Sequence, residues 1–225
     1  MNLHTMSMAV NHFSGSIPQE IGSLRPLTQL ALNHNDLTGP IPISIGNLTS
    51  LVDIYLFNNA LFGHIPLEIG KLEKLSAFHL YRNQLSRNIP GEIGSLAKLV
   101  ILELSSNHLH GNIPREIVKL SNLEVVDLGN NSLYGAIPAF IGSLTNLSSI
   151  YLCRNNLHIP REIGNLRNLS ILQLQRNQPF GNVAGEIGNL EKLSSLMFHF
   201  NQHSGNIPRE IGNLEKLNSL LLQDN

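Results

Sequence analysis

The chain has 225 residues, of which 42% are hydrophobic and 14% are charged. Its 15 Lys and Arg residues nearly balance its 16 Asp and Glu residues, and no basic stripe is visible, so nucleic-acid binding is disfavoured. No apolar run reaches the roughly 18 residues that a membrane-spanning helix requires, so we expect no membrane segment in this chain.

A single pattern, LxxLxxLxLxxNxLxGxIPxxIGxLxx, repeats along the whole sequence. Its asparagine returns every 24 residues, except for one interval of 22 residues between Asn155 and Asn177. Such a period predicts a solenoid of about nine stacked coils forming one domain over residues 1–225. The asparagines that mark the coils are Asn11, Asn35, Asn59, Asn83, Asn107, Asn131, Asn155, Asn177 and Asn201.

The first half of each coil is expected to be a short strand. In the coil that contains residues 51–59, Ile54 and Leu56 alternate with Tyr55 and Phe57. This period of two predicts a strand with its aliphatic side chains inward, and neighbouring coils would align such strands in a parallel sheet. The asparagine that follows should point inward and satisfy backbone groups where the coil turns.

The second half of each coil is expected to contain a turn, an extended segment and a 3₁₀ turn. A glycine such as Gly39 predicts a left-handed turn, the Ile-Pro pair predicts extended backbone, and IGxL predicts the 3₁₀ turn. Arg87 replaces the turn glycine in one coil, and Val118 replaces the glycine of IG in the next. A left-handed backbone at either residue would cost on the order of 1 kcal/mol.

The least regular stretch runs from Asn155 to Gly185, where two residues are missing from one coil and Val183–Ala184 replaces Ile-Pro in the next. We expect locally distorted curvature there. Simple sequence drift is the plainer explanation, because solenoids tolerate irregular units.

The segment LxGxIPxxIGxLxxL, which recurs near the end of the chain as GNIPREIGNLEKL, resembles the plant-specific, extracellular class of leucine-rich repeats. It is most similar to the ectodomains of plant receptor-like kinases, and secreted polygalacturonase-inhibiting proteins are relatives. The resemblance implies a right-handed superhelix with a parallel β-sheet on the concave face, and 3₁₀ turns and short extended segments on the convex face. It also implies recognition of a peptide or protein ligand in signalling, with a co-receptor as a further candidate partner.

The two ends of the chain lack the polar capping units that solenoids need. The chain starts part-way through a coil with no signal peptide, and it contains only Cys153 where the resembled family carries flanking cysteine pairs. We therefore expect a fragment of a larger protein on the extracellular face of the plasma membrane, with any transmembrane segment and serine/threonine kinase outside this chain. The alternatives are a secreted polygalacturonase-inhibitor-like protein and a non-catalytic scaffold.

Function is expected at the outward strand positions, because the inward positions are occupied by packing. Parallel strands turn matching positions into columns, and these columns are rich in aromatic and arginine side chains, which often anchor binding interfaces. We predict that the concave surface binds an extended peptide or a partner protein. The candidate ligand-binding residues are Tyr55, Phe57, His79, Tyr81, Arg82, Glu103, Asp127, Tyr151, Arg154, Gln173 and Arg176.

An enzyme is the alternative to a binding module, because Glu103 and Asp127 should lie side by side, with His79 next to Glu103. Paired carboxylates can perform acid-base chemistry when they are buried, but an open sheet neither excludes water nor shifts a pKa. We therefore expect no catalytic residues. The 10 histidines are scattered through the coils, and neither a metal site nor a cofactor is expected.

Four sequons for N-glycosylation occur, close to the number that composition alone would produce. Three of the asparagines precede an inward leucine and should face solvent, whereas the fourth, Asn130, lies beside the predicted binding face. The candidate sites are Asn47, Asn130, Asn146 and Asn168.

Overall fold

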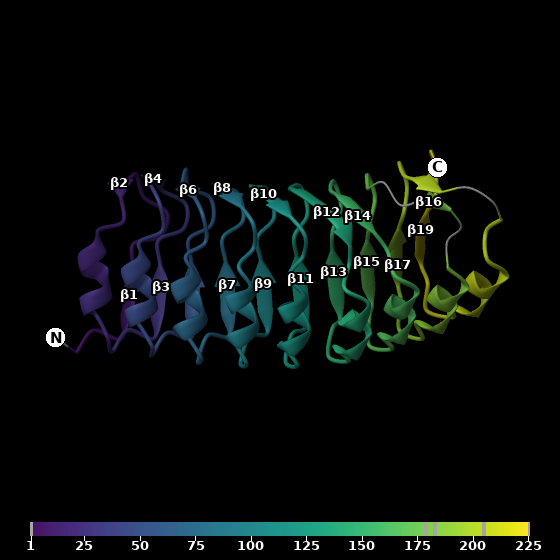
Figure 1. The fold of residues 1–225 in the computed structure, drawn as a ribbon, viewed down its shortest axis with the longest axis horizontal. Coiled ribbons are helices and arrows are strands. Elements are labelled where there is room, and N and C mark those ends of the chain that lie inside the picture. The colour runs from purple at the N-terminus through teal and green to yellow at the C-terminus, as the bar shows by residue number, and fades with distance from the viewer. Residues whose placement is uncertain (1, 178–179, 182–183, 204–205, 225) are drawn as a thin grey trace.

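The computed structural model describes residues 2–177, 180–181, 184–203 and 206–224. Within these residues the chain forms short strands and 3₁₀ turns and no α-helix. Each coil contributes a strand to one long sheet, then a second extended segment, and then a 3₁₀ turn. Figure 1 shows the coils as successive layers, with β1 and β19 at opposite ends of the stack.

The long sheet contains ten parallel strands in chain order. It is the sheet predicted for the concave face, and we call it the concave sheet. Its strands are β1 (Thr5–Ser7), β3 (Gln29–Ala31), β5 (Asp53–Tyr55), β7 (Ala77–His79), β9 (Ile101–Glu103), β11 (Val125–Asp127), β13 (Ser149–Tyr151), β15 (Ile171–Gln173), β17 (Ser195–Met197) and β19 (Ser219–Leu221).

The extended segments of the second half-coil also pair with one another, which the sequence pattern did not indicate. We call them the flank strands. Five of them form one parallel sheet in the order β14-β12-β10-β8-β6, and β2 pairs with β4 and β16 with β18. They are β2 (Ser14–Ser16), β4 (Asp36–Thr38), β6 (Phe62–Gly63), β8 (Gln84–Arg87), β10 (His108–Gly111), β12 (Ser132–Ala136), β14 (Asn156–His158), β16 (Phe180–Gly181) and β18 (Gln202–His203).

The IGxL segments form 3₁₀ turns, as predicted. The residue before each described turn is proline except in the eighth, where it is Ala184, and it is extended in seven of the nine turns. The turns are η1 (Gln19–Ser23), η2 (Ile43–Asn47), η3 (Leu67–Lys71), η4 (Gly91–Ser95), η5 (Arg115–Lys119), η6 (Ala139–Ser143), η7 (Arg161–Asn165), η8 (Gly185–Asn189) and η9 (Arg209–Asn213).

The core is a continuous stack of aliphatic side chains between the concave sheet, the flank strands and the 3₁₀ turns. The register aligns Leu30 with Ile54, Ile54 with Phe78, and Phe78 with Leu102, and all four are buried. Each fully buried aliphatic side chain contributes roughly 1.5–3 kcal/mol before chain entropy is subtracted. The coils are therefore held together by columns of matching residues, as the repeat predicts.

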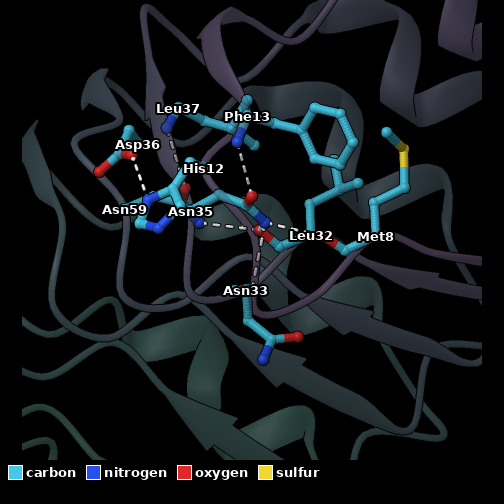
Figure 2. Close-up of polar contacts among 9 residues, drawn as sticks. All are labelled: Met8, His12, Phe13, Leu32, Asn33, Asn35, Asp36, Leu37 and Asn59. Carbon is cyan, nitrogen blue, oxygen red and sulfur yellow. Dashed lines mark hydrogen bonds and ion pairs between the residues drawn. The ribbon is translucent and has the colours of Figure 1, made fainter.

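The asparagines form the predicted ladder, and from Asn35 to Asn201 each one joins two coils, whereas the Asn11 side chain, among the described residues, bonds only within its own coil. Asn35 Nδ2 donates to the carbonyl oxygens of Leu32 in its own coil (3.1 Å) and of Met8 in the preceding coil (2.9 Å). Its Oδ1 accepts a hydrogen bond from the Phe13 N–H at 3.0 Å (Figure 2). The ladder continues across the 22-residue interval, where Asn177 Oδ1 accepts from the Leu157 N–H at 3.0 Å.

Glycine serves two different purposes in the coil. The turn glycines Gly39, Gly63 and Gly111 adopt the predicted left-handed conformation, and Arg87 adopts it as well, with φ 68°. The glycine of IG does not adopt it, and neither does Val118, so the cost considered for a left-handed backbone applies to Arg87 and not to Val118.

The glycine of IG is required by close packing. A Cβ on Gly94 would lie 2.5 Å from the Glu116 carbonyl oxygen in the next coil, and the same glycine in most other coils faces a similar contact. Val118 has a Cβ at this position, and η5 and η6 are the most loosely packed pair of adjacent turns in the described structure. A narrow apolar cavity lined by Ile117 and Ile141 lies at this level of the stack.

A second left-handed column was not predicted. The residue before each ladder position has φ between 53° and 58°, although none of these residues is glycine. This conformation reverses the chain after the strand and turns the next asparagine inward. The column consists of Val10, His34, Asn58, Arg82, Ser106, Asn130, Arg154, Arg176, Phe200 and Asp224.

The distorted curvature expected between Asn155 and Gly185 stays a prediction. The concave strands keep their register there, because Tyr151 pairs with Gln173 and Gln173 with Met197. Residues 178–179 and 182–183 of this stretch lie outside the described residues.

Candidate ligand-binding surface

Four aromatic rings meet on strands β5 and β7 and on the residues just beyond them. Tyr55 stacks on the His79 ring, with centroids 4.9 Å apart, and Phe57 stacks on Tyr81, with centroids 4.3 Å apart and planes 11° from parallel. The Phe57 and His79 rings meet edge to face at 6.3 Å. Neighbouring coils thus build a half-buried aromatic cluster on the concave sheet, because their outward columns are in register.

The aromatic cluster is joined to an acidic pair. His79 Nδ1 lies 2.7 Å from Glu103 Oε2, and the side chains of His79 and Glu103 are only 13% and 28% exposed. Burial raises the pKa of Tyr81 above its ordinary value, and the neighbouring Glu103 raises it further. Burial likewise raises the pKa of Tyr55. Both phenols therefore remain protonated at neutral pH and can donate hydrogen bonds.

Asp127 lies next to Glu103 in the register of β9 and β11, as predicted. Burial raises the pKa of Asp127, whereas hydrogen bonds from the Ser105 side chain and from the Gly129 N–H (2.9 Å) act in the opposite direction. Burial and the nearby Asp127 raise the pKa of the Cys153 thiol, so this cysteine is not an activated nucleophile. The acidic pair is thus engaged with its neighbours, and the expectation that the open sheet would not shift a pKa is wrong for Asp127.

Arginines line one edge of the concave sheet. Arg82, Arg154 and Arg176 occupy the left-handed column and are exposed. The Arg176 guanidinium lies 4.8 Å from the centroid of the Phe200 ring, which is a cation–π contact. Tyr151 and Gln173 are half-buried neighbours on β13 and β15. The structure therefore places all eleven predicted residues on one continuous face, while their role in ligand binding stays a prediction.

Two polar residues that were not among the candidates lie on the same face. Gln175 Oε1 and His199 Nδ1 are buried and have no hydrogen-bond partner among the described residues. They occupy matching positions in adjacent coils, so their column placed them on this face, but nothing in the sequence indicated that these atoms would be buried and unpaired.

The four sequon asparagines are exposed. Asn146 Nδ2 donates to the Ser121 carbonyl oxygen at 2.9 Å, and Asn168 Nδ2 donates to the Thr145 carbonyl oxygen at 2.7 Å. Asn130 Nδ2 lies 3.3 Å from Ser106 Oγ. A glycan would replace one hydrogen of the side-chain amide that forms these contacts. Glycosylation at the four sites stays a prediction.

Two further features concern metal binding and membrane insertion in the described part of the chain. No group of three or more His, Cys, Asp or Glu side chains is arranged to hold a metal ion there. None of its helices has the length and hydropathy needed to cross a bilayer.

Comparison with known families gives a direct match. The sequence matches the family described as "Leucine-rich repeat region" over residues 90–225 and "Leucine Rich Repeat" over residues 26–48. A search of curated protein sequences gave no significant match.

Three solved structures illustrate the similarity. The plant peptide hormone receptor RGFR1, in complex with RGF2, is 35% identical, with a TM-score of 0.94 over 99% of this chain and 36% of its own. The Arabidopsis receptor kinase HAESA, in complex with the peptide hormone IDA and the co-receptor SERK1, is 32% identical, with a TM-score of 0.86 over 98% of this chain and 41% of its own. A plant ice-binding protein is 28% identical, with a TM-score of 0.82 over 98% of this chain and 73% of its own.

The chain thus spans about two fifths of the length of the two receptors it resembles. It belongs to the leucine-rich-repeat family, and it is similar along almost its entire length to the plant receptors of that family.

Proposed function

We propose that this chain is a peptide- or protein-recognition module, and that it forms part of the ligand-sensing ectodomain of a plant receptor-like kinase. The ectodomain would face the cell exterior and carry glycans on some of its sequons, and the membrane anchor and the kinase would lie outside these 225 residues. The similarity to RGFR1 and HAESA, whose structures contain peptide hormones, supports this proposal. A co-receptor is a candidate second partner, as HAESA has one.

The observation that carries the proposal is the stacked pair Phe57–Tyr81, joined through His79 to Glu103. Its ring faces offer apolar area with little loss of side-chain entropy, because neighbouring rings already hold them in place. The carboxylates beside them can accept hydrogen bonds from a ligand, and the arginine edge can pair with acidic groups.

The size of the surface suits an extended peptide. From β5 to β15 there are five inter-strand steps of roughly 4.8 Å, or about 24 Å in all, which is the length of about seven extended residues. A ligand that crosses the strands would meet the aromatic cluster, the acidic pair and the Tyr151–Gln173 region in turn.

A displayed library of random peptides tests the binding surface. We expect peptides selected on the wild-type chain to lose at least tenfold in affinity for the double variant Phe57→Ala, Tyr81→Ala. Phe140→Ala is the matched control, because Phe140 is 76% exposed on η6, away from the concave sheet. Selected peptides that bind the double variant as well as the wild type would place the site elsewhere.

The native product tests the receptor assignment. Membrane and soluble fractions would be immunoblotted with an antibody to this chain, with and without enzymatic deglycosylation. We expect a membrane-bound, glycan-bearing protein much larger than 225 residues. A soluble band of the size of this chain would contradict the receptor proposal and favour a secreted inhibitor or a scaffold.

A further inference from the structure

A groove of about 550 Å³ lies on the flank strands, separate from the concave sheet. Arg87 of β8 and His110 of β10 line it, together with His64 and Asn88, which follow β6 and β8. Its apolar lining consists of Ile65, Leu67 and Pro90. The groove therefore combines an aliphatic floor with cationic and hydrogen-bonding side chains.

The groove depends on the coil in which arginine replaces the turn glycine. Gly39, Gly63 and Gly111 occupy the turn in neighbouring coils, whereas Arg87 adopts the same left-handed conformation and adds a long side chain there. A Cβ on Gly111 would lie 2.6 Å from Asn88 Oδ1, so this glycine leaves the space in which the Asn88 amide lies. The exchange of glycine for arginine thus supplies a cation where the coils of Gly39, Gly63 and Gly111 have no side chain.

The charge of the groove is uncompensated. Within the described residues, Arg87 forms none of the ion pairs found, and no acidic residue lines the groove. The Leu67 side chain is 56% exposed beside it, whereas Ile65 is buried. A guanidinium has a planar set of donors that matches a carboxylate, and the aliphatic floor next to it favours an apolar group on the same ligand.

We propose that this groove is a second binding site, which accepts an extended segment of a partner protein that carries an Asp or Glu side chain next to an aliphatic one. The carboxylate accepts hydrogen bonds from Arg87 and from the imidazoles of His64 and His110, while the aliphatic side chain contacts Leu67 and Pro90. The groove spans three strands, or roughly 10 Å, which corresponds to about three extended residues. Because it crosses the flank strands, the partner chain can continue on both sides.

The test is a nuclear magnetic resonance titration of the isotope-labelled 225-residue chain with two capped peptides, acetyl-Leu-Glu-Leu-amide and acetyl-Leu-Gln-Leu-amide. We expect saturable shifts at the backbone amides of His64, Arg87 and His110 with the glutamate peptide. The glutamine peptide, which has the same size and no charge, should bind at least tenfold more weakly.

Two variants separate this site from the concave surface. Arg87→Gly should weaken binding of the glutamate peptide at least tenfold while keeping the fold, because glycine readily adopts the left-handed conformation at this position. Arg82→Gln removes an exposed arginine at the edge of the concave surface and should leave binding in the groove unchanged. Binding of the glutamate peptide in the groove and binding of a ligand on the concave surface can therefore fail independently of each other.

Four outcomes would overturn the proposal. These are equal binding of the two peptides, no saturable shifts at the groove, unchanged binding by Arg87→Gly, and equal shifts with sodium acetate, which would indicate a simple anion site. Shifts at the same amides that appear on concentrating the protein alone would instead assign the groove to a second copy of the chain.

Discussion

The asparagine ladder can be tested at Asn83, in the middle of the stack. Its side chain is 7% exposed and forms three hydrogen bonds of 3.0–3.1 Å with backbone groups, besides a longer one of 3.5 Å to the Tyr81 carbonyl oxygen. Oδ1 accepts from the Leu61 N–H at 3.0 Å, and Nδ2 donates to the carbonyl oxygens of Leu56 and Leu80 at 3.1 and 3.0 Å. Asn83→Ala removes all three hydrogen bonds at once.

The cost follows from the burial of these groups. A buried backbone group without a partner costs about 1–3 kcal/mol. Asn83→Ala leaves the Leu61 N–H in that state, whereas the Leu56 and Leu80 carbonyl oxygens still accept hydrogen bonds from Asn59 Nδ2 and Asn107 Nδ2, so we expect a loss of about 1–3 kcal/mol. Asn11 provides the matched control, because it is exposed and donates to the Met8 and Ala9 carbonyl oxygens at 3.3 and 3.0 Å. Water can hydrogen-bond to these two carbonyl oxygens in place of the Asn11 amide, so we expect Asn11→Ala to cost no more than about 1 kcal/mol.

Urea denaturation followed by circular dichroism would compare the two variants. Hydrogen exchange at the Leu61 amide would report the lost bond directly, even if the solenoid unfolds in more than one step. We expect the Leu61 amide to exchange faster in Asn83→Ala and not in Asn11→Ala. Equal destabilisation by the two substitutions, or a loss below about 0.5 kcal/mol in Asn83→Ala, would refute the reasoning from buried backbone groups.

Three further predictions follow from the backbone and the acidic pair. Arg87→Gly should stabilise the chain by about 1 kcal/mol in thermal unfolding, because it relieves a left-handed arginine; an unchanged or lower Tm would contradict this. Gly94→Ala should destabilise by about 1–3 kcal/mol because its Cβ would lie 2.5 Å from the Glu116 carbonyl oxygen, whereas Gly212→Ala, whose Cβ meets no described atom within 4 Å, should have little effect; similar losses in both would argue against close packing. Burial raises the pKa of Asp127 above 3.8, so the contribution of Asp127 to the free energy of unfolding should fall as the pH rises from about 3.8 through the raised pKa. Urea titrations at several pH values should show this fall in the wild type but not in Asp127→Asn.

Because the sequence repeats, most of the fold could be predicted from it. Every coil has nearly the same length and the same apolar positions, so matching residues had to align. The alignment of Ile54 with Phe78 and of Tyr55 with His79 followed from counting alone, and the register confirms both. The placement of the candidate residues on one face was predictable for the same reason.

Side-chain contacts between neighbouring coils could not be predicted from the repeat pattern. The pattern shows that Phe57 and Tyr81 share a column, but whether their rings stack depends on side-chain rotation within that column. The regular recurrence of the IG glycine likewise pointed to a left-handed backbone at this position. The actual constraint is the close approach of a carbonyl oxygen in the next coil. That neighbour lies more than twenty residues away in sequence.

By itself, the sequence determined the period, the inward and outward columns, the asparagine ladder and the 3₁₀ turns, because each of these repeats within one coil. Only the tertiary structure decided which conformation the residue before each asparagine adopts, how close adjacent turns approach, and that Arg87 overlies an apolar groove. These features depend on distances between coils, which packing sets and which no single repeat encodes.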